Sequence, residues 1–187
     1  MSKPVITDSL EFPSDSNIVR FLYIAGGAGI IASVVGYTFN SDQFFFSYLT
    51  SFVFFTGIAL AALLMVMLHH ITRSSWGVPL RRIAESFASN FHIWAIFIIP
   101  VILGIHNLFH WSHPEVLDPA SMEYDKILKG KSAYLNTPFF IARQVLYFAI
   151  WGFLGYRLHK ISIDMDHTGD WGISTLMRKI SAPGILL

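Results

Sequence analysis

Residues 44–72 read FFFSYLTSFVFFTGIALAALLMVMLHHIT and contain no Asp, Glu, Lys or Arg. An apolar run longer than about 18 residues can cross the hydrocarbon core of a bilayer as an α-helix. Hydrocarbon offers no partner to the backbone, so such a segment must be helical. The run lacks the alternation of apolar and polar residues that marks a membrane β-strand. The stretch therefore predicts an integral membrane protein built from helices.

Other parts of the chain share this apolar character. The predicted spans lie near residues 18–39, 44–70, 83–109 and 138–160. We expect an all-α fold in which these four spans form an antiparallel bundle over residues 18–162. No acidic residue, Lys or Arg occurs between Glu85 and Glu115, which covers the core of the third span. Pro100 lies inside that span, and its missing backbone N–H predicts a kink there.

The two ends of the chain differ from this core. Residues 1–17 contain Asp8, Glu11 and Asp15 and lack the pattern of a cleavable signal, so we expect a cytoplasmic N-terminal tail followed by a first apolar helix that is retained. Residues 163–187 are expected to form an amphipathic segment, followed near Pro183 by the start of a further, truncated helix. We therefore expect that the natural polypeptide is longer.

The distribution of Lys and Arg predicts the orientation. Basic residues are concentrated on cytoplasmic loops of membrane proteins. On one predicted side lie Lys3, Arg20, Arg73, Arg81, Arg82, Arg157, Lys160, Arg178 and Lys179, and on the other Lys126, Lys129, Lys131 and Arg143. The bias predicts that both termini are cytoplasmic and that the loop 110–136 lies outside.

Composition excludes several kinds of function. The chain has a formal net charge of +1, so no basic surface for nucleic acid is indicated. It contains no cysteine, which removes Cys-ligated iron–sulfur clusters, thiolate catalysis and covalently attached haem c from this chain. The sequence predicts no metal site, and any iron–sulfur cluster or haem c would lie on a partner.

Ionisable groups at membrane depth are costly and are therefore candidates for function. On the inner side, Arg81 and Arg82 precede Glu85 by four and three residues, a spacing that predicts an interfacial ion pair. Alternatively, Glu85 and His92 lie two turns apart on one helix face and form the entry of a proton path. A histidine suits that role because it titrates near neutral pH.

A second set of candidates lies toward the outer side. His106 and His110 are four residues apart and are expected to share a helix face. They are candidates for contact with a quinol or a proton, or they are simply polar residues at the interface. Arg143 either extends its side chain to the outer interface or is a buried charge that meets an anionic or quinone-like group.

Several short motifs resemble one known family. They read FTGIAL (55–60), LHHIT (68–72), WGV (76–78), RRIAES (81–86), RQVLY (143–147) with Trp151, and SAPG (181–184). These motifs resemble the second large membrane subunit of alternative complex III, which belongs to the NrfD-like (polysulfide-reductase-like) superfamily. The resemblance runs along the whole chain and covers about the first half of a typical family member.

The resemblance implies a membrane subunit of a respiratory quinol:electron-acceptor oxidoreductase in the bacterial inner membrane. It implies haem c and iron–sulfur clusters on other subunits, no cofactor held by this chain alone, and quinone or quinol as the ligand that it would face. The proton path would involve Glu85 and His92, and the outer polar residues would be His106, His110 and Arg143. Two alternatives remain open, namely half of a transporter or channel, and a purely structural membrane scaffold.

Overall fold

The computed structural model describes residues 16–72, 78–168 and 172–186, and within these ranges it contains helices and no β-strand. Residues 1–44 and 45–187 form two compact units, and each is described by itself. Predicted features at residues 1–15, 73–77, 169–171 and 187 lie outside these ranges, and they include the WG dipeptide of the connector motif.

The first unit contains α1 (Asn17–Phe39) and the first residues of α2 (Ser41–Thr72). The side-chain oxygen of Ser16 accepts a hydrogen bond from the backbone N–H of Val19 at 3.3 Å and caps α1. Asn40 ends the helix in an extended conformation, and its side-chain oxygen accepts a bond from Gln43 N at 3.0 Å. A helix long enough to cross a bilayer therefore occupies the predicted first span.

Two longer helices correspond to the second and fourth predicted spans. α2 and α8 (Thr137–Thr168) each contain 32 residues. Together with α1, they are the three helices of the described residues that are individually long and apolar enough to cross a membrane. α8 extends beyond the predicted end at residue 160 and includes Asp164 and Asp166, which sequence analysis assigned to the cytoplasmic end segment. The multi-pass character predicted from the sequence is thus supported.

The third predicted span is divided into four short helices: α3 (Val78–Ala88), α4 (Phe91–Phe97), α5 (Ile99–Leu103) and α6 (Ile105–Leu108). The pieces Leu80–Ala88 and Phe91–Leu103 are bent by 44° relative to each other, and they are apolar enough to cross a membrane only when they are counted as one broken span. A further interruption at Ile98 separates α4 from α5. The 44° bend lies ahead of Pro100, and a kink caused by Pro100 itself stays a prediction.

The bend between α3 and α4 has a local cause in Asn90. Its side-chain amide donates a hydrogen bond to the carbonyl of Ser86 at 2.6 Å, the acceptor that the Asn90 backbone would use in a continuous helix. The Asn90 backbone N–H bonds instead to Phe87 O at 3.4 Å. A side chain that competes for a helical acceptor in this way interrupts the ladder and bends the helix.

The loop between the third and fourth spans contains short helical turns. These are η1 (His110–Ser112), η2 (Pro114–Leu117) and α7 (Lys126–Gly130). Asp125 caps α7 by accepting bonds from the backbone N–H groups of Ile127 at 2.7 Å and Leu128 at 3.2 Å. α7 packs against η2, so this loop has local order of its own.

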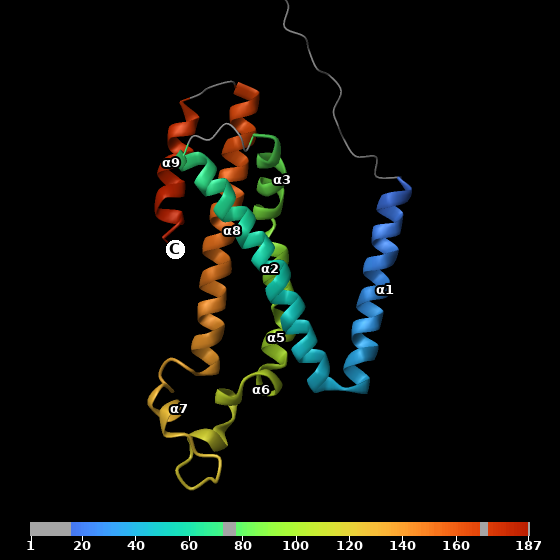
Figure 1. Ribbon diagram of the computed structural model, residues 1–187, viewed down its shortest axis with the longest axis vertical. Helices are drawn as coiled ribbons and strands as arrows, with labels where there is room; N and C mark the ends of the chain where they lie inside the picture. The colour runs from blue at the N-terminus through green and yellow to red at the C-terminus, as the bar shows by residue number, and fades with distance from the viewer. Residues whose placement is uncertain (1–15, 73–77, 169–171, 187) are drawn as a thin grey trace, which may run out of the picture. The chain divides into compact units, whose positions relative to one another are not determined.

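Within the second unit, α8 packs against α3, α4 and α9 (Ile173–Gly184), and Figure 1 shows α9 beside the C-terminal part of α8. Gly155 allows the closest approach, because a Cβ at this position would overlap the carbonyl oxygen of Ala88. Glycine at a helix crossing lets two backbones approach in this way. Pro183 lies inside the last turn of α9, and a further helix that starts there stays a prediction.

Candidate functional site

Glu85 on α3 is a fully buried carboxylate held by two arginines. Its side chain has no exposed surface, and only 1% of the residue is accessible. Arg81 Nε donates to Oε1 at 2.9 Å, and Arg82 Nη1 donates to Oε2 at 3.0 Å. The ion pairs expected from the sequence spacing are therefore present. Both carboxylate oxygens have a charged partner, which a buried carboxylate requires in order to remain ionised.

The opposite wall of this site comes from α8. Ser162 is completely buried, and its hydroxyl oxygen accepts a hydrogen bond from Arg81 Nη2 at 2.5 Å. Asp166 forms ion pairs with both guanidinium groups, through Oδ1 to Arg81 Nη2 at 3.7 Å and through Oδ2 to Arg82 Nη2. Two arginines and two carboxylates thus form a balanced set across the contact between α3 and α8. We call Arg81, Arg82, Glu85, Ser162 and Asp166 the Arg–Glu cluster.

His159 lies beside this cluster on α8. Its Nδ1 is 3.9 Å from Glu85 Oε2 and is buried without a hydrogen-bond partner. That distance is too long for a direct hydrogen bond. The imidazole side chain is 28% exposed, whereas the carboxylate is not exposed at all. His159 therefore links a partly accessible edge of the site to a sealed acidic group.

Sequence reasoning missed the contribution of α8 to this site. It placed Asp166 in a polar cytoplasmic segment and gave Ser162 no role. The structure corrects this, because α8 continues to Thr168 and carries both residues onto the arginines. The spacing of His159, Ser162 and Asp166 was a usable signal, since residues three, four and seven apart lie on one face of a helix.

His92 does not share a face with Glu85. The shared face assumed a continuous helix, and the 44° bend between Ala88 and Phe91 interrupts that helix. Glu85 is buried, whereas His92 is exposed. The structure brings His159 rather than His92 next to the carboxylate. A role for His92 in proton transfer stays a prediction without a contact to the Arg–Glu cluster.

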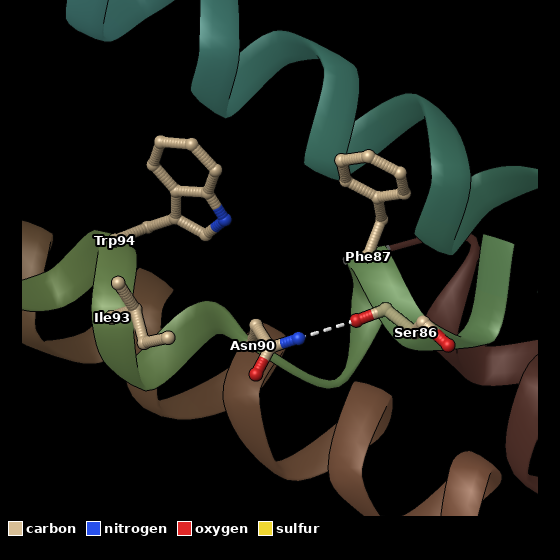
Figure 2. Close-up of a pocket in the computed structure, with 5 residues that line it drawn as sticks. All are labelled: Ser86, Phe87, Asn90, Ile93 and Trp94. Carbon is tan, nitrogen blue, oxygen red and sulfur yellow. Dashed lines mark hydrogen bonds between the residues drawn. The ribbon is translucent and has the colours of Figure 1, made fainter. Parts of the chain in front are cut away.

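Two open hollows adjoin the bend and share Trp94. The first, of about 270 Å³, is lined by Ser86, Phe87, Asn90, Ile93 and Trp94. Figure 2 shows the rings of Phe87 and Trp94 rising from the same side of the α3–α4 turn, with the Asn90 amide bonded to Ser86. The second, of about 330 Å³, is lined by Tyr48, Ser51, Phe52, Phe55, Trp94 and Phe97. Both hollows have mainly aromatic and aliphatic walls.

The outer histidines are grouped, but not on one helix face. His106 lies in α6, which ends at Leu108, and His110 begins the separate turn η1. The shared α-helical face expected for them is therefore absent. The chain reversal instead brings the ring of His113 to 5.8 Å from that of His106 and 6.1 Å from that of His110. His106 Nδ1 also lies 3.1 Å from Ser112 Oγ.

Arg143 extends toward the N-terminal end of α8. Its guanidinium carbon lies 3.8 Å from the ring centroid of Tyr134 and 4.9 Å from that of Phe139. Tyr134 precedes the first residue of α8, so the side chain reaches back toward the loop, as expected for an arginine that extends to the interface. The two rings hold the guanidinium plane by cation–π contacts.

The described residues contain no group of three or more His, Asp or Glu side chains placed to hold a metal ion. The Arg–Glu cluster holds paired charges at the contact between α3 and α8 and fixes the two helices against each other. The aromatic hollows can accept a flat, mainly apolar ring. The sequence matches no model of a known protein family and no curated protein.

Proposed function

We propose that this chain is a cofactor-free membrane subunit of a respiratory quinol:electron-acceptor oxidoreductase of the alternative complex III type. It would contribute quinone-facing surface, a proton path, or both. Haem c and iron–sulfur clusters would lie on partner subunits. The proposal draws on the short motifs quoted above and on the chemistry of the Arg–Glu cluster.

The proposed arrangement in the bacterial inner membrane has four antiparallel spans. α1, α2 and α8 would each cross once, and α3 to α6 would together form the broken third span, with a second change of direction at Pro100. Both termini would be cytoplasmic. The Arg–Glu cluster would then lie near the cytoplasmic end of the bundle, and the outer histidines near the opposite end. The segment after α9 would lead into a further helix.

The main observation behind this proposal is the fully buried carboxylate of Glu85. A buried ionisable group is costly in any protein, and in a membrane bundle it marks an ion or proton pathway by default. His159 lies 3.9 Å away and is partly exposed, so it is the ionisable side chain placed between Glu85 and the edge of the site. In this proposal, protons pass between the aqueous edge and Glu85 through His159, while the arginines stabilise the ionised carboxylate.

The hollow at the α3–α4 bend fits the quinone part of the proposal. Phe87 and Trp94 provide aromatic walls, and Ser86, the sequence neighbour of Glu85, also lines it. A quinone ring needs apolar walls and a few polar groups that fix its orientation. The Asn90 side-chain oxygen could accept a hydrogen bond from a quinol hydroxyl, because its amide nitrogen is already bonded to Ser86 O.

The test is purification of the tagged chain from its native membrane in mild detergent. We expect haem c absorbance and quinol:cytochrome c reductase activity to accompany it. Glu85→Gln and His159→Gln should lower turnover at least several-fold, whereas Glu123→Gln, in an exposed loop position, should not. A colourless, inactive preparation, under conditions that keep other respiratory complexes intact, would overturn the proposal.

One observation favours a structural scaffold as the second candidate. Each oxygen of Glu85 is already bonded to an arginine, which is also how a purely structural ion-pair network satisfies its charges. The two candidates predict different kinetics. A scaffold role predicts that Glu85→Gln lowers the yield of assembled complex but leaves the turnover per assembled complex unchanged.

A further inference from the structure

Arg143 has aromatic neighbours but no acceptor for its N–H groups. Its Nε is buried and has no hydrogen-bond partner, and no ion pair joins its guanidinium to a carboxylate among the residues that the structure describes. Its contacts are the faces of Tyr134 and Phe139. A guanidinium carries five donors in a fixed planar fork, and buried donors without acceptors are costly.

The Arg143 guanidinium lies near the N-terminal end of α8, and this position determines which kind of ligand can contact it. Arg143 follows Thr137 by about 9 Å along the helix axis, at 1.5 Å per residue. Its side chain extends back toward Tyr134, which precedes the helix, and the guanidinium carbon lies 3.8 Å from the centroid of that ring. The guanidinium is therefore brought to the depth at which an apolar span meets the headgroup region.

We propose that Arg143 binds the phosphate of a phospholipid headgroup, with Tyr134 and Phe139 fixing the plane of the guanidinium. Two parallel N–H groups would donate to two phosphate oxygens, which is the geometry that arginine offers and lysine does not. The rings of Tyr134 and Phe139 contact the guanidinium but offer its N–H groups no acceptor oxygen in their planes. The proposal requires only that α8 spans a bilayer and is independent of any quinol chemistry.

A phosphate fits this group better than the carbonyl of a quinone. A phosphodiester carries a full negative charge and presents paired oxygens, so it neutralises Arg143 and satisfies two donors at once. A quinone carbonyl is neutral and accepts fewer bonds. Phosphatidylglycerol supplies both the charge and the acyl chains that would lie along the exposed apolar residues Val145 and Leu146.

The test is native mass spectrometry of the full chain, purified with its partners and titrated with phosphatidylglycerol. Arg143→Gln should weaken binding roughly tenfold, the loss expected for a charge-assisted bidentate contact. Arg143→Lys should bind at an intermediate level, and Tyr134→Leu should weaken binding although the charge is kept. Arg157→Gln, which removes the same charge from the other half of α8, is the matched control and should leave binding unchanged.

Three further outcomes separate the sources of the ligand. If diacylglycerol, which lacks a phosphate, binds as well as phosphatidylglycerol, the headgroup contact is wrong. If inorganic phosphate competes at equal concentration, the site binds a free anion rather than a lipid. If Arg143→Gln releases quinone and retains phospholipid, the site belongs to the quinone. Should Arg143→Gln fail to assemble, Tyr134→Leu and Arg143→Lys, which keep the positive charge, still decide among these results.

Discussion

Glu85 shows how one residue depends on partners from two helices. Arg81 and Arg82 come from its own helix and could be anticipated from their spacing, whereas Ser162 and Asp166 approach from α8. A carboxylate with no exposed surface is stable only while its counter-charges remain. The energetics of this residue are therefore tied to the packing of α3 on α8.

Removing the charge of Glu85 should destabilise the fold. We expect Glu85→Gln to lower the free energy of unfolding by about 3 kcal/mol, because Arg81 and Arg82 would each lose one of their two counter-charges, the one that is buried. Reversible unfolding in mixed micelles, followed by tryptophan fluorescence, measures this. The pair Arg81→Met with Glu85→Leu should cost less than Glu85→Gln alone, since no unpaired charge remains. Equal stability of Glu85→Gln and the wild type would contradict the charge argument.

At the scale of elements, α8 organises the second unit. It contacts α3, α4 and α9, and its glycines set how closely it approaches the bend of the third span. A side chain at Gly155 would meet a backbone carbonyl, which cannot move without displacing α3. At Gly152 the nearest atom to an added Cβ is Phe91 Cβ at 3.7 Å, an ordinary van der Waals contact.

The two glycines therefore form a matched pair for mutation. Gly155→Ala should destabilise the protein by at least about 2 kcal/mol, because an overpacked contact with backbone cannot relax through a rotamer change. Gly152→Ala should be neutral or slightly stabilising, since alanine favours a helix over glycine. Thermal unfolding in detergent compares the two variants. Equal effects would show that α8 does not approach Ala88 as closely as the structure indicates.

At the scale of the whole molecule, the number of membrane crossings depends on the broken third span. Three described helices are each long enough to cross, and the bent pair makes a fourth only if its pieces act together. The residues Thr72, at the end of α2, and Met122, in the following loop, lie on either side of this segment. Their positions relative to the membrane therefore report whether it crosses.

Because the sequence contains no cysteine, single introduced cysteines can report on which side of the membrane Thr72 and Met122 lie. We expect Thr72→Cys and Met122→Cys, both at exposed positions, to react with a membrane-impermeant maleimide from opposite faces of sealed vesicles. Thr168→Cys serves as the control. Between Met122 and Thr168, α8 is the helix that is long enough to cross a membrane, so these two positions should react from opposite faces. Labelling of Thr72→Cys and Met122→Cys from the same face would mean that α3 to α6 form a re-entrant segment.

The sequence by itself determined the all-helical class, the long apolar helices and the ion pair within α3. These follow from local properties, namely uncharged runs that must satisfy their own backbone and charges spaced by one helical turn. It did not reveal that Asn90 would divide the third span, that α8 would continue to Thr168, or that His159 rather than His92 would lie beside Glu85. Only the tertiary structure decided these points. A side chain that competes for one backbone carbonyl changes which residues face each other, and burial at a helix crossing depends on both helices.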